Sequence, residues 1–216
     1  MLDIDVAQIF IAFTVLLFSL TVHECAHAWT ADRLGDPTAR LLGRVSLNPM
    51  VHADLIGTVL FPLVAMTTGA PLIGWAKPVP VNVGQLHHPR RDYVIVAAAG
   101  PSANLVLAVL SATLLSILPV SPQTLGEANV SVPLATILSQ AMRLNVLLAV
   151  FNMIPIPPLD GGNVLAGLLP PAIGRQFNAI LRPYGFLVLY ALMLSGRLQD
   201  LIGPPYRLLI SWLPTG

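Results

Sequence analysis

Seventeen consecutive residues without a charge, 6–22, lead directly into the pentapeptide H-E-C-A-H at 23–27. An uncharged run of this length favours a helix embedded in a membrane, because about 20 apolar residues cross a bilayer. Ionisable side chains at such a depth are costly unless they are paired or functional. The stretch from residue 6 to about residue 31 therefore predicts a membrane helix that carries a functional site.

The two histidines of the pentapeptide, His23 and His27, are four residues apart, so they lie on one face of a helix and both imidazoles can bind one metal ion. Glu24 then lies beside the ion rather than on it. In zinc peptidases this arrangement lets the carboxylate take a proton from a water that the ion activates. The same pattern arises by chance on helices of soluble proteins, but its apolar setting here favours a metal site.

The composition excludes an ordinary soluble protein. Of the 216 residues, 55% are hydrophobic and only 10% are charged, whereas about a quarter are charged in soluble domains. We therefore expect one integral membrane domain over residues 1–216, with a catalytic core at about 6–165 and C-terminal helices at about 178–213. The net charge of +1 and the lack of a basic cluster argue against a nucleic-acid partner.

Further apolar stretches predict that the fold is an all-α bundle of transmembrane helices in a lipid bilayer. They lie at 93–118, from about 134 to 152, and at 184–195. The remaining C-terminal stretch, 201–213, is short and contains prolines, so we expect it in the membrane interface rather than across the bilayer.

Residues 51–86 do not fit this pattern of long helices. The apolar part, 55–68, is short, and the segment 74–82 reads G-W-A-K-P-V-P-V-N. Two prolines separated by one residue favour an extended edge strand. We expect a re-entrant segment of extended or β-hairpin structure that dips into the bilayer and returns; an ordinary span followed by a peripheral loop is the alternative.

The basic residues predict an orientation. Arg33, Arg40 and Arg44 follow the first helix, whereas no Lys or Arg precedes it. By the positive-inside rule, the N-terminus lies outside and the arginine loop lies in the cytoplasm.

A catalytic zinc usually takes three protein ligands, and no histidine follows His27 at the spacing of the longer soluble motifs. Depth along the helices narrows the search for the third ligand. At a rise of 1.5 Å per residue, Glu24 and Asn152 each lie about 27 Å from the outer end of their helices, so the motifs that contain them reach the same depth and can meet. Asp160 is the one remaining candidate within an apolar span at that depth. The candidates for the third ligand are Asp32, His52, Asp54, His87, His88, Asp92 and Asp160.

Four blocks together resemble the site-2 protease family of intramembrane zinc metalloproteases. They are H-E-C-A-H, G-W-A-K-P-V-P-V-N, A-G-P-S-A-N at 99–104 and N-M-I-P-I-P-P-L-D-G-G at 152–162, and they cover the chain from about residue 20 to 165. The resemblance implies one Zn²⁺ per chain, held by His23, His27 and Asp160, with Glu24 as the general base.

The resemblance also implies that Asn152 holds the substrate or the developing oxyanion. Asn104 is a second candidate for that role, although an intramembrane amide can equally bond a neighbouring helix. Lys77, Val79 and Val81 are expected to offer a strand edge to an unwound substrate helix.

The expected function is therefore an intramembrane endopeptidase that cleaves transmembrane protein substrates in a prokaryotic cell membrane, with its active site toward the cytoplasmic side. No PDZ-like or nucleotide-sensing domain is expected in the chain. Two alternatives remain, a metal or proton transporter and a catalytically silent scaffold. A transporter would distribute its ionisable groups along a path rather than gather them at one depth.

Overall fold

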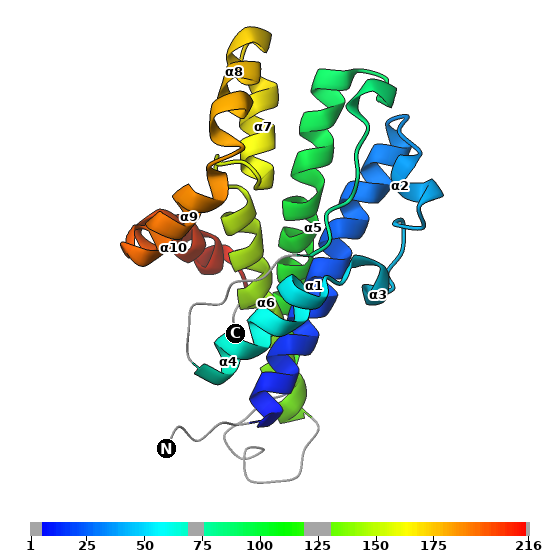
Figure 1. Cartoon of the computed structure of the whole chain (residues 1–216). Coiled ribbons are helices and arrows are strands. Elements are labelled where there is room, and N and C mark those ends of the chain that lie inside the picture. Colours follow the sequence, from blue (N-terminus) through cyan, green and yellow to red (C-terminus); the bar gives the residue numbers. More distant parts are fainter. Residues whose placement is uncertain (1–5, 69–75, 119–130, 215–216) are drawn as a thin grey trace.

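The computed structural model describes residues 6–68, 76–118 and 131–214, and all the regular elements within those ranges are helices. The all-α prediction is therefore confirmed (Figure 1). The elements are α1 (Val6–Arg33), α2 (Thr38–Leu41), α3 (Pro49–His52), η1 (Leu55–Leu60), α4 (Phe61–Thr68), η2 (Val83–Gln85), α5 (Pro89–Ile117), α6 (Ser131–Asn152), α7 (Asp160–Leu168), α8 (Pro171–Leu181), α9 (Gly185–Leu194) and α10 (Arg197–Trp212).

Within the described ranges, α1, α5 and α6 are long and apolar enough to cross a membrane. They pack side by side, with α1 and α6 running in one direction and α5 in the other (Figure 1). Each is a nearly uninterrupted run of apolar residues, which is what a helix in lipid requires because its backbone groups must all be bonded within it. The protein is therefore a membrane protein with these three helices as its centre.

The stretch 184–195, predicted as a membrane span, forms the short helix α9 in the structure. α9 has only ten residues, about 15 Å at a rise of 1.5 Å per residue, and cannot cross a bilayer alone. α8 and α9 are long and apolar enough for one span only when taken together, and they are bent by 63° relative to each other. The sequence Arg182-Pro183-Tyr184 separates the two helices, since proline cannot continue the hydrogen-bond ladder of α8.

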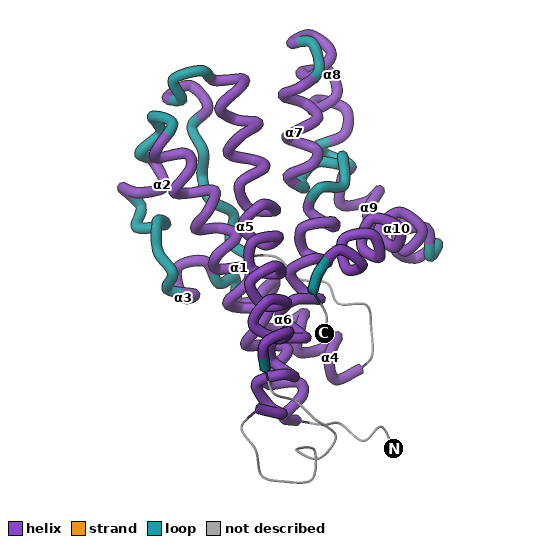
Figure 2. The backbone as a smooth tube through the Cα atoms, turned by 180° about the vertical axis from the view of Figure 1, so that it is seen from behind, coloured by secondary structure: helices purple, strands orange, loops and turns teal. Residues whose placement is uncertain are grey.

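The C-terminal stretch, expected within helices at about 178–213 and in the membrane interface, forms α10. This helix passes through Pro204 and Pro205 and lies beside α6 in the view from behind (Figure 2). Its apolar face packs on a buried cluster formed by Ala108, Val146 and Val150. That packing stabilises the helix despite the two missing backbone donors.

The segment between α4 and α5 contains no strand among the residues that the structure describes. Residues 69–75, which include Gly74 and Trp75 of the motif at 74–82, lie outside the described ranges. Residues 76–82 contain no regular element and run as an extended trace in Figure 1. The re-entrant β-hairpin therefore stays a prediction.

The apolar segment 55–68 is one π-helical turn, η1, followed by α4. Asp54 caps its start, with Oδ1 accepting from the backbone N–H groups of Ile56 and Gly57 at 3.0 and 2.7 Å. Such a cap fixes where the helix begins, because it bonds N–H groups that have no partner inside the helix.

Candidate metal centre

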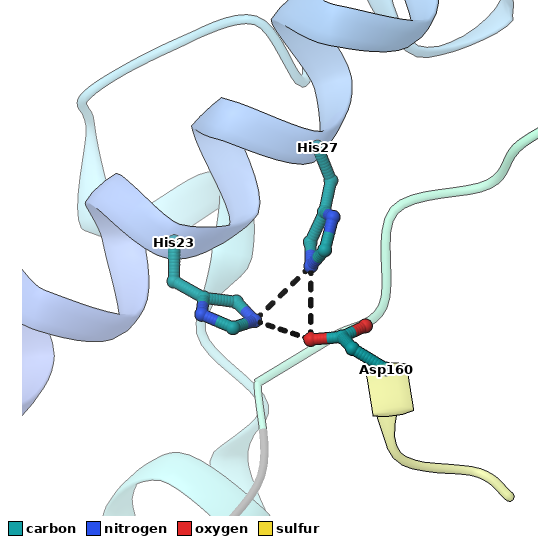
Figure 3. A group of neighbouring side chains, drawn as sticks. All are labelled: His23, His27 and Asp160. Atoms are coloured by element: carbon teal, nitrogen blue, oxygen red, sulfur yellow. Dashed lines mark hydrogen bonds and ion pairs between the residues drawn. The ribbon is translucent and has the colours of Figure 1, made fainter. Parts of the chain in front are cut away.

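Three ligand atoms from two helices meet at one point (Figure 3). His23 and His27 lie one turn apart on α1, and Asp160 is the first residue of α7. The two Nε2 atoms are 3.1 Å apart. Asp160 Oδ2 lies 3.1 Å from Nε2 of His23 and 3.3 Å from Nε2 of His27. Among the His, Cys, Asp and Glu side chains that the structure describes, these three form the group that could hold a metal ion.

Asp160 reaches α1 because the chain breaks after α6. Pro155, Pro157 and Pro158 follow the last turn of α6, and each lacks the N–H that would extend the helix. Gly162 lies so close to the backbone of Ile156 and the ring of Pro157 that a Cβ there would be 2.6 Å from the carbonyl carbon of Ile156. The turn thus folds back tightly enough for α7 to begin beside the two histidines.

Both imidazoles are held through their other ring nitrogen. His27 Nδ1 lies 2.7 Å from the backbone carbonyl of Val96 on α5, and a carbonyl can only accept, so Nδ1 carries the hydrogen. His23 Nδ1 lies 2.6 Å from Oδ1 of Asn104. In the neutral form of both residues Nε2 therefore keeps its lone pair, and this is the form of histidine that binds a metal.

The orientation of the Asn104 amide is fixed by its own partners. Its Nδ2 donates to Oδ1 of Asn145 at 2.7 Å and to the carbonyl of Ser19 at 3.3 Å. Asn145 in turn donates from Nδ2 to the Ser19 hydroxyl at 2.9 Å and to the carbonyl of Ala141 at 2.8 Å. Ser19, Asn104 and Asn145 are each at most 1% exposed. This chain of amides joins α1, α5 and α6 behind His23, with Oδ1 of Asn104 turned toward the imidazole.

Gly100 gives the imidazoles room. A Cβ at this position of α5 would lie 2.6 Å from Nε2 and 2.6 Å from Cε1 of His23, closer than real Cβ contacts come, and it would also overlap Nε2 of His27. A small residue in a membrane helix allows close packing, and here Gly100 packs against the two imidazoles. α5 can approach the two histidines because this position has no side chain.

The donor set fits a zinc ion. Three acceptor atoms lie 3.1 to 3.3 Å apart, close to the roughly 3.3 Å between ligands of a tetrahedral zinc with bonds of about 2.0–2.1 Å. Asp160 Oδ2 is buried and receives no hydrogen bond from the described residues. With both Nε2 atoms unprotonated, the three lone-pair atoms repel one another unless a cation lies among them. Two imidazoles and one carboxylate are a ligand set of catalytic zinc sites.

Glu24 points to the segment 76–82 rather than into the ligand group. Its Oε2 accepts from the backbone N–H of Val79 at 3.2 Å. The same segment is held at either end, since Lys77 N donates to the His52 carbonyl at 2.8 Å and Asn82 N donates to Oδ2 of Asp36 at 2.6 Å. Glu24 therefore lies beside the ligand group, between α1 and an extended backbone.

The two N–H groups of Lys77 and Val79, which we expected at a free strand edge, are thus bonded within the protein. Val81 packs its side chain against the buried cluster of Ala31, Leu86 and Val96. A peptide that docks on this side of the segment must therefore replace a bond that the protein already makes, including the one to Glu24.

The two asparagines predicted to touch the substrate differ in the structure. Asn104 uses both ends of its amide inside the protein, which favours a role in holding His23 over contact with a substrate. Asn152 donates from Nδ2 to the carbonyl of Leu148 at 3.0 Å, within its own helix, and is only partly buried. Its Oδ1 has no bond among the described residues.

Other candidates for the third ligand are engaged elsewhere. Asp32 accepts from Arg40 Nε at 2.8 Å, Asp54 caps η1, and Asp92 accepts from the backbone N–H of His88 at 2.7 Å. His52 is buried on α3, where its Nε2 lies 2.9 Å from the carbonyl of Ser46. Among the candidates, the structure brings only Asp160 into the described ligand group with His23 and His27.

Sequence reasoning missed three parts of this site: the Val96 carbonyl, the Ser19 and Asn145 partners, and the contact of Gly100 with the imidazoles. The carbonyl has no signature in a sequence. The asparagines do have one, because two amides in uncharged spans each need a partner in lipid and can supply one another.

Comparisons with known proteins give a family for the chain. The sequence matches the family described as Peptidase family M50 over residues 11–133 and 119–196. It is 37% identical over 180 residues to "Putative zinc metalloprotease YwhC" of Bacillus subtilis, covering 83% of this chain and 78% of that relative. It is 33% identical over 184 residues to "Putative zinc metalloprotease Rip2" of Mycolicibacterium smegmatis, covering 85% of this chain and 66% of that relative. No solved structure matches.

Proposed function

We propose that this chain, which belongs to peptidase family M50, the site-2 protease family of zinc metalloproteases, hydrolyses peptide bonds in or near the transmembrane segments of other membrane proteins. The observation that carries this proposal is the position of the ligand group. His23 and His27 belong to a helix that is apolar enough to cross a membrane, so the reaction they serve takes place at membrane depth. A substrate for such a site is itself a chain in the membrane.

One zinc ion per chain would be held by His23, His27 and Asp160, leaving one coordination position for water or substrate. When bound, zinc polarises the scissile carbonyl and lowers the pKa of water to about 7. The three ligands gather at one point, which favours an enzyme over a transporter with groups spaced along a path.

Glu24 is the proposed general base. It is adjacent to His23 in the sequence, lies outside the ligand group, and keeps a carboxylate oxygen close to the extended segment 76–82. From there it can accept the proton of the attacking water and pass it to the leaving amide nitrogen. The Val79 N–H holds the carboxylate in place for this transfer.

Asn152 is the proposed donor to the oxyanion. Its Nδ2 bonds the carbonyl of Leu148 in the last turn of α6, a bond that can exchange for one to substrate by a rotation of the side chain. Asn104 is proposed instead as a positioning residue for His23, because its amide is engaged on both sides. Peptide substrates lie in extended form along residues 76–82, where Lys77, Val79 and Val81 contribute backbone carbonyls, because the N–H groups of Lys77 and Val79 are already bonded within the protein.

The proposed orientation puts the N-terminus outside and the metal centre toward the cytoplasm of a prokaryotic cell. Arg90, at the start of α5, donates to the carbonyls of Gly167, Leu168 and Leu169 at the end of α7. The start of α5 and the end of α7 therefore lie together on one side of the bundle.

The experiment that tests the function compares Glu24→Gln with Asp160→Ala. Glu24→Gln keeps the size of the side chain but cannot take a proton, so the purified protein should bind about one zinc and lose at least the 10²–10⁴-fold typical of an acid–base group in cleavage of a membrane substrate. Asp160→Ala should lose zinc and activity together, because it removes one of three ligands. Near wild-type cleavage by Glu24→Gln would refute the mechanism, and full zinc in Asp160→Ala would assign the third ligand elsewhere.

A further inference from the structure

An arginine stands in the middle of a membrane helix and forms no ion pair with any residue that the structure describes. Arg143 is on α6, within the span Val132–Asn152, and its side chain is exposed. None of the ion pairs among the described residues includes it, and no described residue accepts a hydrogen bond from its guanidinium. Neither the metal centre nor the proposed reaction uses this charge.

The depth of Arg143 makes contact with lipid head groups difficult. At a rise of 1.5 Å per residue, it lies about 16 Å from the Val132 end of the span and about 13 Å from the Asn152 end. Both distances exceed the length of an arginine side chain. Side chains on a helix also lean toward its N-terminus, which here is the farther end. A guanidinium at this depth is costly unless a counter-charge reaches it inside the membrane.

Arg143 lines a groove of about 250 Å³, which we call the Arg143 groove. Two helical stripes form its walls, and Tyr206 of α10 closes one side. The lining residues are Ala12, Val15, Leu16, Gln140, Arg143, Leu144, Leu147 and Tyr206. On α1 the spacing is i, i+3, i+4, and on α6 it is i, i+3, i+4, i+7, so each wall is one face of a helix. Such a groove fits a third helix packed along α1 and α6.

The Arg143 groove has few polar groups, namely those of Gln140, Arg143 and Tyr206. Gln140 bonds Gln8 across the groove, with its Nε2 donating to Gln8 Oε1 at 3.0 Å. The Tyr206 hydroxyl makes no bond with the described residues. The guanidinium thus offers several N–H donors, and the hydroxyl one more, to an acceptor in a groove that is otherwise apolar.

We propose that the Arg143 groove docks a transmembrane helix of another protein that carries an Asp or Glu side chain near the middle of its span. The carboxylate would pair with Arg143, and the apolar surface of the helix would pack against the stripes of α1 and α6. Each charge alone is costly in the bilayer, and pairing them offsets both costs. A second copy of this chain does not meet the requirement, because among the described residues the carboxylates of the long helices are Glu24 beside the metal centre and Asp32 and Asp92 near helix ends.

The test uses synthetic helices as probes. Three peptides share a core of about 20 leucine and alanine residues with lysine flanks and differ only in the central residue, which is Glu, Gln or Lys. Their association with the full-length chain in phosphatidylcholine bilayers is measured by energy transfer, with Glu24→Gln as the common background so that no peptide is cut. We expect the Glu peptide to bind at least about tenfold more tightly than the Gln peptide, which corresponds to about 1.4 kcal/mol.

Variants of the protein assign the preference to the groove. Arg143→Gln should bind the Glu and Gln peptides equally, and Arg143→Glu should prefer the Lys peptide. Arg175→Gln is the matched control, because it removes an exposed arginine that lies outside the three long spans. It should keep the wild-type preference.

Equal binding of the Glu and Gln peptides by the protein with Arg143 intact would overturn the proposal, and this measurement does not depend on the folding of any variant. A Glu preference that persists in Arg143→Gln would also overturn it. If added phosphatidylglycerol abolishes the preference at a fixed peptide concentration, Arg143 binds a lipid phosphate instead of a helix, and the proposal is wrong. Cleavage activity does not enter these measurements, so they stand apart from the test of the proposed function.

Discussion

His23 of α1 donates its Nδ1 hydrogen to Oδ1 of Asn104 of α5 at 2.6 Å, and so a residue of one helix decides which nitrogen of another helix faces the ligand group. The arrangement is the amide counterpart of the carboxylate that often holds a metal-binding histidine. Asn145 and Ser19 keep the Asn104 amide from turning over. The correct tautomer of His23 is therefore fixed by contacts among α1, α5 and α6.

We expect Asn104→Ala to weaken zinc binding by about 10- to 100-fold, because the imidazole loses the acceptor that fixes its tautomer and direction. Competition with a chromogenic chelator measures the zinc affinity of the purified protein. Ser102→Ala is the control, since Ser102 lies on the same helix but is exposed and bonds only its own backbone, at Ala98 O. Equal zinc affinity in Asn104→Ala and wild type would show that the contact does not position the ligand.

Gly100→Ala should displace the imidazoles. The new methyl group would lie 2.6 Å from Nε2 of His23, and relieving that overlap costs about 1–3 kcal/mol of stability or moves α5 away from α1. We expect lower zinc content and a lower melting temperature. Gly84→Ala is the matched control, because the nearest atom to its added Cβ, Oδ1 of Asn82, is an ordinary 3.4 Å away. Full zinc content in Gly100→Ala would mean that the helices can separate without cost to the site.

Val79→Pro removes the N–H that Glu24 accepts while keeping an extended backbone between two existing prolines. Zinc content should stay the same, and kcat should fall by about tenfold to a hundredfold, because the base is no longer held in place. The control is Val83→Pro at the first position of η2, where proline suits the start of a helix. A kcat unchanged by Val79→Pro would show that Glu24 is oriented by something other than this backbone.

Reporter fusions test the orientation. Fusions after Arg44, Arg91 and Arg175 should read cytoplasmic, and one near Glu127 should read external, because the basic residues cluster after alternate apolar runs. Opposite readings at Arg44 and Arg91 would mean that residues 51–86 cross the membrane completely, and the re-entrant interpretation would then be wrong.

The long helices could be predicted from the sequence because each is a long run of apolar residues. The predicted stretches 6–31 and 93–118 correspond to α1 (Val6–Arg33) and α5 (Pro89–Ile117) within a few residues. The C-terminal helices were expected at about 178–213, but the unbroken course of α10 could not be predicted, since Pro204 and Pro205 suggest an end to a helix and the packing against α6 outweighs them. The bend between α8 and α9 was likewise hidden, because an apolar run does not reveal the angle at which it is interrupted.

At the metal centre, too, features that follow from helix geometry could be predicted, whereas features that depend on packing between helices could not. The spacing of His23 and His27 places both on one helix face, and the depth argument singles out Asp160, because both follow from a fixed rise and turn per residue. The bond of Asn104 to Asn145 depends on how far α5 and α6 rotate about their own axes. That rotation is set by the packing of all the side chains between the helices, so no short motif records it.

The order of the three proposed ligands along the chain determines when the proposed metal site can be complete. His23 and His27 enter the membrane with the first helix made, whereas Asp160 follows only after α5 and α6 have been synthesised. A partly translated chain holds two of three ligands, and two ligands bind the ion weakly. On the proposed function, a growing chain therefore cannot cut the membrane segments around it before α7 has been made.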